Sequence, residues 1–196
     1  MTQAQIRAMQ AKIGAEVDGF WGPRSIAACQ RHLRSLMPAP ARFPRQAGVR
    51  AFYGPNGVRG GYTPPTTTIR LPFTIYYDAQ AVNTLSPHRL CAQSLLNVFN
   101  RLAAAFPTRA ERQAAGILTY NGLYNPRRMR GNSGAWSMHA WAIAIDLNAG
   151  SNGNMTHWPA RATMPLEVME CFAAEGWLPA GAFWSRDAMH FQATAP

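Results

Sequence analysis

The sequence predicts an α+β protein with a small helical unit at its N-terminus and a larger domain built around a mainly antiparallel sheet. Segments with the apolar spacing of helices and short apolar segments typical of buried strands occur along the same chain. They do not alternate regularly, which argues against the parallel sheet of βαβ units. The chain has 196 residues, 47% of them hydrophobic, so it can hold one domain and a small module.

The helical unit is predicted over residues 1–37. Apolar residues at positions i, i+3 and i+7, from Ile6 to Ile13, form one face of a first helix. Asp18-Gly19 marks a turn after this helix. Gly22-Pro23 then leads into a second helix, because proline suits the first turn of a helix.

Residues 38–50 are rich in Pro, Ala and Arg and are predicted to form a linker to the larger domain, residues 51–196. Gly, Pro and Thr dominate residues 51–72, where we expect loops. The elements predicted after these loops are a strand at 73–77, a helix at 90–106, strands at 117–120 and 142–147, a helix at 165–174 and a last strand at 189–193.

The chain carries a formal charge of +10, from 19 basic and 9 acidic residues, and Lys12 is its only lysine. Such an excess favours a polyanionic partner, for example an anionic bacterial envelope. No zinc finger, RNP-type aromatic motif or basic helical arm is present, so nucleic acid is not the expected partner.

The compartment is inferred from three features. No apolar run approaches the roughly 20 residues of a membrane helix, so stable membrane insertion is not expected. The N-terminus lacks the basic segment and apolar core of a signal peptide, which predicts synthesis in the cytoplasm. Cys29, Cys91 and Cys171 are far apart and form no CxxC pair, so we expect buried free thiols rather than a zinc-cysteine site.

Two short segments carry the candidate chemistry. Ser137-Met138-His139 precedes an apolar run that ends at Asp146, and Asp187 lies three residues before His190. Two histidines and one aspartate can hold a zinc ion and leave its fourth position open for water. A further carboxylate beside that water could take its proton. The combination predicts metal-assisted hydrolysis.

The spacing of the first pair sets a structural condition. His139 and Asp146 are seven residues apart, and on one continuous strand they would face opposite sides. We therefore expect His139 on a turn or bulge that enters the strand. Asp146 follows Ala-Ile-Ala-Ile, where a carboxylate is costly unless it is paired, solvated or bound to a metal. A tight turn would bring Asp187 and His190 toward the same site.

The two segments resemble the zinc metallopeptidases of the D-alanyl-D-alanine carboxypeptidase group, which includes phage L-alanyl-D-glutamate endopeptidases. The signature of that group reads Ser-x-His-x-x-Gly-x-Ala-x-Asp, followed by an acidic residue, two spacers, His and an aromatic residue. The matching residues are Ser137, His139, Ala144, Asp146, Asp187, His190 and Phe191, with Ala142 in place of the signature glycine. The resemblance spans about residues 70–193.

The resemblance implies that His139, Asp146 and His190 bind Zn²⁺ and that Asp187 is the catalytic acid and base.

It also suggests substrate contacts. Arg127 matches the upstream arginine of the family and is expected to hold a substrate carboxylate or a developing oxyanion. Arg130 is the second candidate, although either arginine could belong to a solvated basic loop. Ser137 is expected to orient His139 or to bind substrate, and the alternative is that it only supports the turn.

The N-terminal unit has a resemblance of its own. Asp18-Gly19, an aromatic residue, Gly22-Pro23, Ser25 and a small apolar helix ending near Gln30 resemble the helical peptidoglycan-binding module of many wall hydrolases. This resemblance covers about residues 3–36 and implies binding to the cell wall. The alternative is an ordinary helical hairpin without a ligand.

Together these features predict a monomeric, phage-endolysin-like zinc endopeptidase that cuts a stem-peptide bond of bacterial peptidoglycan. It would reach the wall in the periplasm after a separate protein permeabilises the membrane. One alternative is a D,D-carboxypeptidase that trims terminal D-Ala. Another is a non-catalytic wall-binding or virion structural protein.

Overall fold

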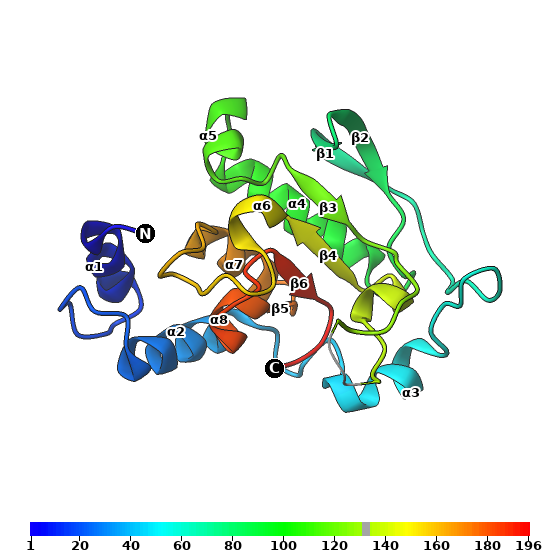
Figure 1. Cartoon of the computed structure of the whole chain (residues 1–196), viewed down its shortest axis with the longest axis horizontal. Helices are drawn as coiled ribbons and strands as arrows, with labels where there is room; N and C mark the ends of the chain where they lie inside the picture. Colours follow the sequence, from blue (N-terminus) through cyan, green and yellow to red (C-terminus); the bar gives the residue numbers. More distant parts are fainter. Residues whose placement is uncertain (131–133) are drawn as a thin grey trace.

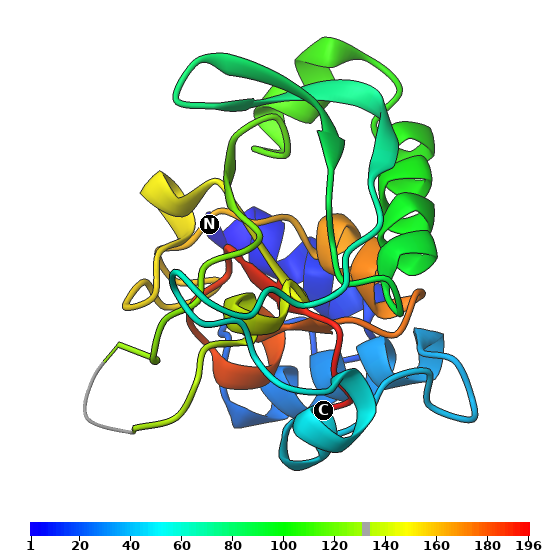
Figure 2. The same cartoon turned by 90° about the vertical axis from the view of Figure 1, so that its right-hand side faces the viewer.

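A computed structural model describes residues 1–130 and 134–196 and confirms the α+β class (Figure 1). The main sheet is antiparallel, with its strands in the order β3-β4-β6-β5. These strands are β3 (Tyr120–Gly122), β4 (Ala144–Leu147), β6 (His190–Gln192) and β5 (Leu178–Pro179). Figure 2 shows a hairpin of β1 (Ile69–Tyr77) and β2 (Gln80–Leu85) above this sheet.

Helices surround the two sheets. The α-helices are α1 (Gln3–Lys12), α2 (Pro23–Leu36), α3 (Val49–Tyr53), α4 (Ala92–Ala105), α5 (Arg109–Ala114), α6 (Ala149–Asn152), α7 (Leu166–Ala173) and α8 (Ala180–Trp184). Two 3₁₀ helices, η1 (Gln46–Gly48) and η2 (Met138–Trp141), precede α3 and β4 respectively.

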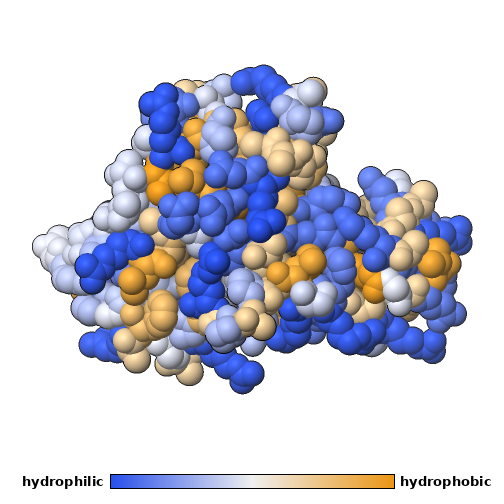
Figure 3. All heavy atoms as spheres, turned by 180° about the vertical axis from the view of Figure 1, so that it is seen from behind, coloured by the Kyte–Doolittle hydropathy of each residue, from blue (hydrophilic) through white to orange (hydrophobic). Residues whose placement is uncertain are grey.

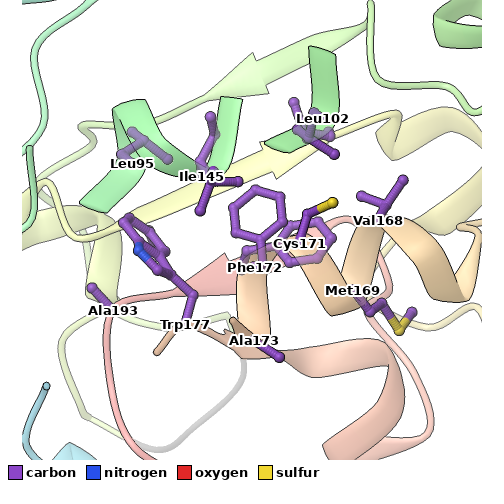
Figure 4. Close-up of a cluster of buried hydrophobic side chains, with 14 of the residues drawn as sticks. Leu95, Leu102, Ile145, Val168, Met169, Cys171, Phe172, Ala173, Trp177 and Ala193 are labelled. Carbon is purple, nitrogen blue, oxygen red and sulfur yellow. The ribbon is translucent and has the colours of Figure 1, made fainter. Parts of the chain in front are cut away.

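The hydrophobic core lies between the main sheet and helices α4 and α7 (Figure 4). Leu95 and Leu102 of α4 meet Ile145 of β4, and Phe172 of α7 stacks on Phe191 of β6 with ring centroids 3.8 Å apart. The apolar spacing that predicts α4 and α7 therefore marks the faces that these helices bury. This packing fixes β4 and β6, the two strands that carry Asp146 and His190.

The N-terminal helices pack onto the same core. Helix α2 contacts α7 and α8, and its Leu33 is fully buried within the cluster that contains Phe172. Lys12 of α1 forms ion pairs with Glu167 and Glu170 of α7. The division of the chain into units 1–37 and 51–196 nevertheless stays a prediction.

The segment that follows α2 runs along the C-terminal residues. Ala195 N donates a hydrogen bond to Pro44 O, and the Tyr53 hydroxyl donates to Ala193 O at 2.8 Å. Loops were expected from residue 51, but α3 extends to Tyr53 and β1 begins at Ile69. Val49 and Tyr53 are buried on one face of this short helix, so tertiary packing rather than helix propensity accounts for α3.

Several elements have no counterpart in the sequence prediction, and β2 and α5 show why. Strand β2 is largely exposed and lacks an apolar alternation, so the period-two pattern that reveals a half-buried strand is missing. Helix α5 has no buried residue, and its start is instead fixed by a capping box between Thr108 and Glu111. The three cysteines are buried free thiols, as predicted.

The described part of the chain has no helix that is long and apolar enough to cross a membrane. On the face seen in Figure 3, hydrophobic residues form separate small groups among hydrophilic ones.

Candidate active site

His139, Asp146 and His190 come together at the edge of the core. Their potential ligand atoms all lie within 4.8 Å of one another, and the three residues are buried. Asp146 Oδ1 lies 3.2 Å from His139 Nε2 and 2.9 Å from His190 Nδ1. Asp146 and His190 are direct partners across β4 and β6, so the sheet register sets their approach.

The condition on the spacing of His139 and Asp146 is met by an irregular backbone. His139 lies in η2, and Ala142 then adopts a left-handed conformation with φ 56° and ψ 35° before β4 begins. This reversal turns His139 toward the face of β4 that carries Asp146. The position occupied by glycine in the family signature is thus a left-handed position, which glycine adopts without strain.

The ring of His139 has a defined tautomer. Its Nδ1 lies 2.8 Å from the carbonyl oxygen of Leu123 and donates a proton to it. In the neutral ring, Nε2 therefore carries the lone pair, and in the described part of the chain this buried atom has no hydrogen-bond partner. Its 3.2 Å approach to Asp146 Oδ1 lacks hydrogen-bond geometry.

The ring of His190 is oriented in the same manner by a neighbour. Gln192 Nε2 donates to Thr194 Oγ1 at 2.7 Å, which leaves Gln192 Oε1 to accept from His190 Nε2 at 3.1 Å. His190 Nδ1 lies 2.9 Å from Asp146 Oδ1, and in the neutral ring with its proton on Nε2 the lone pair of Nδ1 is available to a cation at this point. Such outer contacts are typical of histidines that bind metals.

Three potential ligand atoms therefore converge on one point, an arrangement that a cation between them would stabilise. Ligand atoms around a tetrahedral zinc ion lie about 3.3 Å apart, close to the two separations measured from Asp146. In the absence of a metal, a proton on His190 Nδ1 can take the place of the cation by donating a hydrogen bond to Asp146 Oδ1. Burial lowers the pKa of His190, but Asp146 beside it raises that pKa above its ordinary value. The donor set thus fits zinc.

Asp187 lies on the turn that precedes β6. Its backbone is left-handed, with φ 60°, and His190 N donates to Asp187 O at 2.9 Å. Aspartate tolerates this conformation better than most residues. Asp187 Oδ1 is buried without a hydrogen-bond partner among the described residues, and burial raises the pKa of this carboxyl group. A carboxyl group with a raised pKa is a better proton acceptor than an ordinary aspartate, which suits a role in proton transfer.

A cavity opens over these residues. His139, Asp146, Asp187 and His190 line it together with Arg127, Arg130 and Ser137, so it contains every site residue that the sequence predicts. The structure brings these residues to one place, whereas their individual roles stay predictions.

Sequence reasoning missed several residues of the cavity. Gln46 of η1 and Gln192 of β6 line it, although neither belongs to the signature. Trp184, three residues before Asp187 in the sequence, also lines the cavity and stacks over His190 with ring centroids 5.7 Å apart. Trp136, which directly precedes Ser137 in the sequence, lies outside the cavity with its ring covered by Arg128.

The comparison with protein families matches the same part of the chain. Residues 130–193 match the family model of D-alanyl-D-alanine carboxypeptidase. The matched segment is less than half of the chain and contains His139, Asp146, Asp187 and His190. It supports a metallopeptidase with a peptidoglycan-related function. No curated protein and no solved structure matches the chain.

Proposed function

We propose that the protein is an endolysin-like, zinc-dependent endopeptidase that cuts a stem-peptide bond of bacterial peptidoglycan. The observation that carries this proposal is the convergence of three potential ligand atoms, from His139, Asp146 and His190, beside Asp187, whose Oδ1 is buried without a hydrogen-bond partner among the described residues. The family match supports the peptidase chemistry.

The roles of the residues follow from their positions. A bound zinc ion would polarise the scissile carbonyl group and lower the pKa of a water molecule. Asp187 accepts a proton from the attacking water and then delivers a proton to the leaving nitrogen. Arg127 and Arg130, at the rim of the cavity, attract the carboxylates of the stem peptide or stabilise negative charge on the carbonyl oxygen.

The shape of the cleft supports an endopeptidase. A second cavity, along β3, shares Arg127, Arg130, His139 and Asp146 with the first, so the cleft continues on both sides of the metal ligands. A substrate chain can extend in both directions from the scissile bond. The description of the matched family keeps a D,D-carboxypeptidase as the second candidate, which would release only terminal D-Ala.

The N-terminal unit is proposed to bind the wall. Gln10 holds its turn through hydrogen bonds to Asp18, Phe20 and Ser25. Phe20 is 70% exposed beside a cavity of about 330 Å³. The charge of +10 would concentrate a monomeric enzyme on the anionic wall in the periplasm, an effect that salt weakens. Release from the cytoplasm would require permeabilisation of the membrane by another protein.

The proposal is tested with purified peptidoglycan. The wild-type protein should release peptides whose masses identify the cleaved bond, and a chelator should stop their release. Asp187→Asn should abolish hydrolysis while the variant still binds zinc. Glu167→Gln, the same chemical change at an exposed carboxylate, is the matched control.

Each alternative predicts a different result. Release of D-Ala alone identifies a carboxypeptidase. Hydrolysis that is unchanged by Asp187→Asn contradicts the assigned role of this residue. Zinc binding without any released product favours a non-catalytic wall-binding or structural protein.

A further inference from the structure

The cleft along β3 has a composition of its own. This cavity, of about 300 Å³, is lined by Tyr77, Tyr120 and Tyr124 together with Asn121 and Asn125, and we call these five residues the tyrosine arm. The arm meets the cavity of Asp187 at His139 and Asp146. None of its five residues belongs to the motifs that predict the metal site.

The position of Asp187 gives the cleft a direction. Asp187 lines the first cavity and is absent from the tyrosine arm. Under the proposed function, Asp187 protonates the leaving nitrogen, which belongs to the C-terminal product. The C-terminal product therefore occupies the cavity of Asp187, and the acyl side of the substrate extends into the tyrosine arm. In peptidoglycan, the N-terminus of the stem peptide is joined through a lactyl ether to an N-acetylated amino sugar.

The side chains of the arm suit a sugar of this kind. Tyr77 is 45% exposed and Tyr124 36%, and Tyr77 meets Tyr120 edge to face with ring centroids 5.9 Å apart. A tyrosine ring presents an apolar face and a polar hydroxyl, which complement the C–H face and hydroxyl groups of a sugar ring. Asn121 Oδ1 accepts a hydrogen bond from Ala149 N, so the amide NH₂ group of Asn121 remains as a donor for an N-acetyl carbonyl.

We propose that the tyrosine arm is a binding site for the N-acetylmuramyl group to which the stem peptide is attached. The inference rests on the proposed function, because the direction of the cleft depends on the role of Asp187. The enzyme would then recognise the sugar side of its substrate as well as the peptide.

The test compares two substrates that differ only in the sugar. One is a stem peptide joined to its disaccharide, and the other is the same peptide with an acetylated N-terminus. For wild-type protein, kcat/KM should be higher for the sugar-bearing substrate. Tyr77→Ala should reduce the ratio of the two kcat/KM values about tenfold. Tyr62→Ala should leave the ratio unchanged, because Tyr62 is equally exposed, at 45%, and lies outside both cavities.

A binding measurement separates this inference from the proposed function. The Asp187→Asn variant is titrated calorimetrically with the sugar-bearing peptide, with and without the additional Tyr77→Ala change. Affinity that depends on Tyr77 supports the tyrosine arm, even if the wild-type protein hydrolyses neither substrate and the proposed function fails. Equal effects of Tyr77→Ala on both substrates, or affinity that does not depend on Tyr77, would overturn the inference.

Discussion

Ala142 is a buried alanine in a left-handed conformation, at the position where the family signature has glycine. A left-handed residue with a Cβ atom is strained by about 1–2 kcal/mol. Glycine would relieve this strain, at the cost of about 0.8 kcal/mol for the lost buried methyl group and up to about 1 kcal/mol of chain entropy.

Ala142→Gly is therefore expected to leave the free energy of unfolding within about 1 kcal/mol of wild type. Ala144→Gly is the matched change, because Ala144 is equally buried but has no left-handed strain to relieve, and it should destabilise the protein by about 1–2 kcal/mol. Urea unfolding measures both values. If both substitutions lower the free energy of unfolding by the same amount, glycine does not relieve the backbone strain at Ala142.

The contact between Gln192 and His190 leads to a second prediction for single residues. Gln192→Leu removes the acceptor that orients the His190 ring, and the affinity for zinc should fall about 10- to 100-fold. Gln113→Leu, at an exposed position far from the cavity, is the control. Competition with a chromogenic chelator measures the affinity, and an unchanged affinity for Gln192→Leu would contradict the proposed orientation of His190.

The metal-site residues were predictable from sequence because they occupy two short segments with distinctive spacing. The irregular entry to β4 followed from the seven-residue separation of His139 and Asp146. Gln46 and Tyr77 were not predictable as cavity residues, because each reaches the site from an element distant in sequence and matches no motif. The packing of η1 places Gln46 there, and the packing of the β1–β2 hairpin places Tyr77 there.

At the scale of elements, α8 connects the N-terminal unit to the metal site. Gln30 of α2 donates a hydrogen bond to the carbonyl oxygen of Ala182, and the guanidinium group of Arg34 lies 4.9 Å from the ring centroid of Phe183. The next residue, Trp184, stacks over His190. Helix α2 therefore supports the segment that covers the metal ligand.

Arg34→Ala should weaken this support. A cation–π contact of this kind contributes about 0.5–1 kcal/mol, so we expect zinc affinity to fall about two- to fivefold. Arg31→Ala makes the same change of charge at an exposed position of the same helix and is the control. Equal effects of the two substitutions would indicate a general electrostatic effect rather than support through α8.

At the scale of the whole molecule, the N-terminal helices share the core of the remaining chain. Leu33 is fully buried in that core, whereas Leu36, on the same helix, is 38% exposed. Helix α2 itself was predicted from its Gly22-Pro23 start. The surface against which it packs was not, because α7 lies more than a hundred residues later.

Leu33→Ala should lower the stability of the entire chain by about 2–4 kcal/mol, and Leu36→Ala by less than about 1 kcal/mol. Both variants should unfold in one transition that is accompanied by loss of the metal site. Calorimetry with bound zinc follows both events. Two separate transitions, with the metal site unaffected by Leu33→Ala, would show that residues 1–37 form an independent unit.

The central claim concerns the metal, and the most direct test is the stoichiometry of zinc in purified protein after dialysis. Elemental analysis should find one zinc per chain in wild type and in Asp187→Asn. It should find none in His139→Ala or His190→Ala, while His157→Ala, at an exposed histidine outside the cluster, retains the metal. A wild-type protein that binds no zinc, or a His139→Ala variant that retains it fully, would contradict the account.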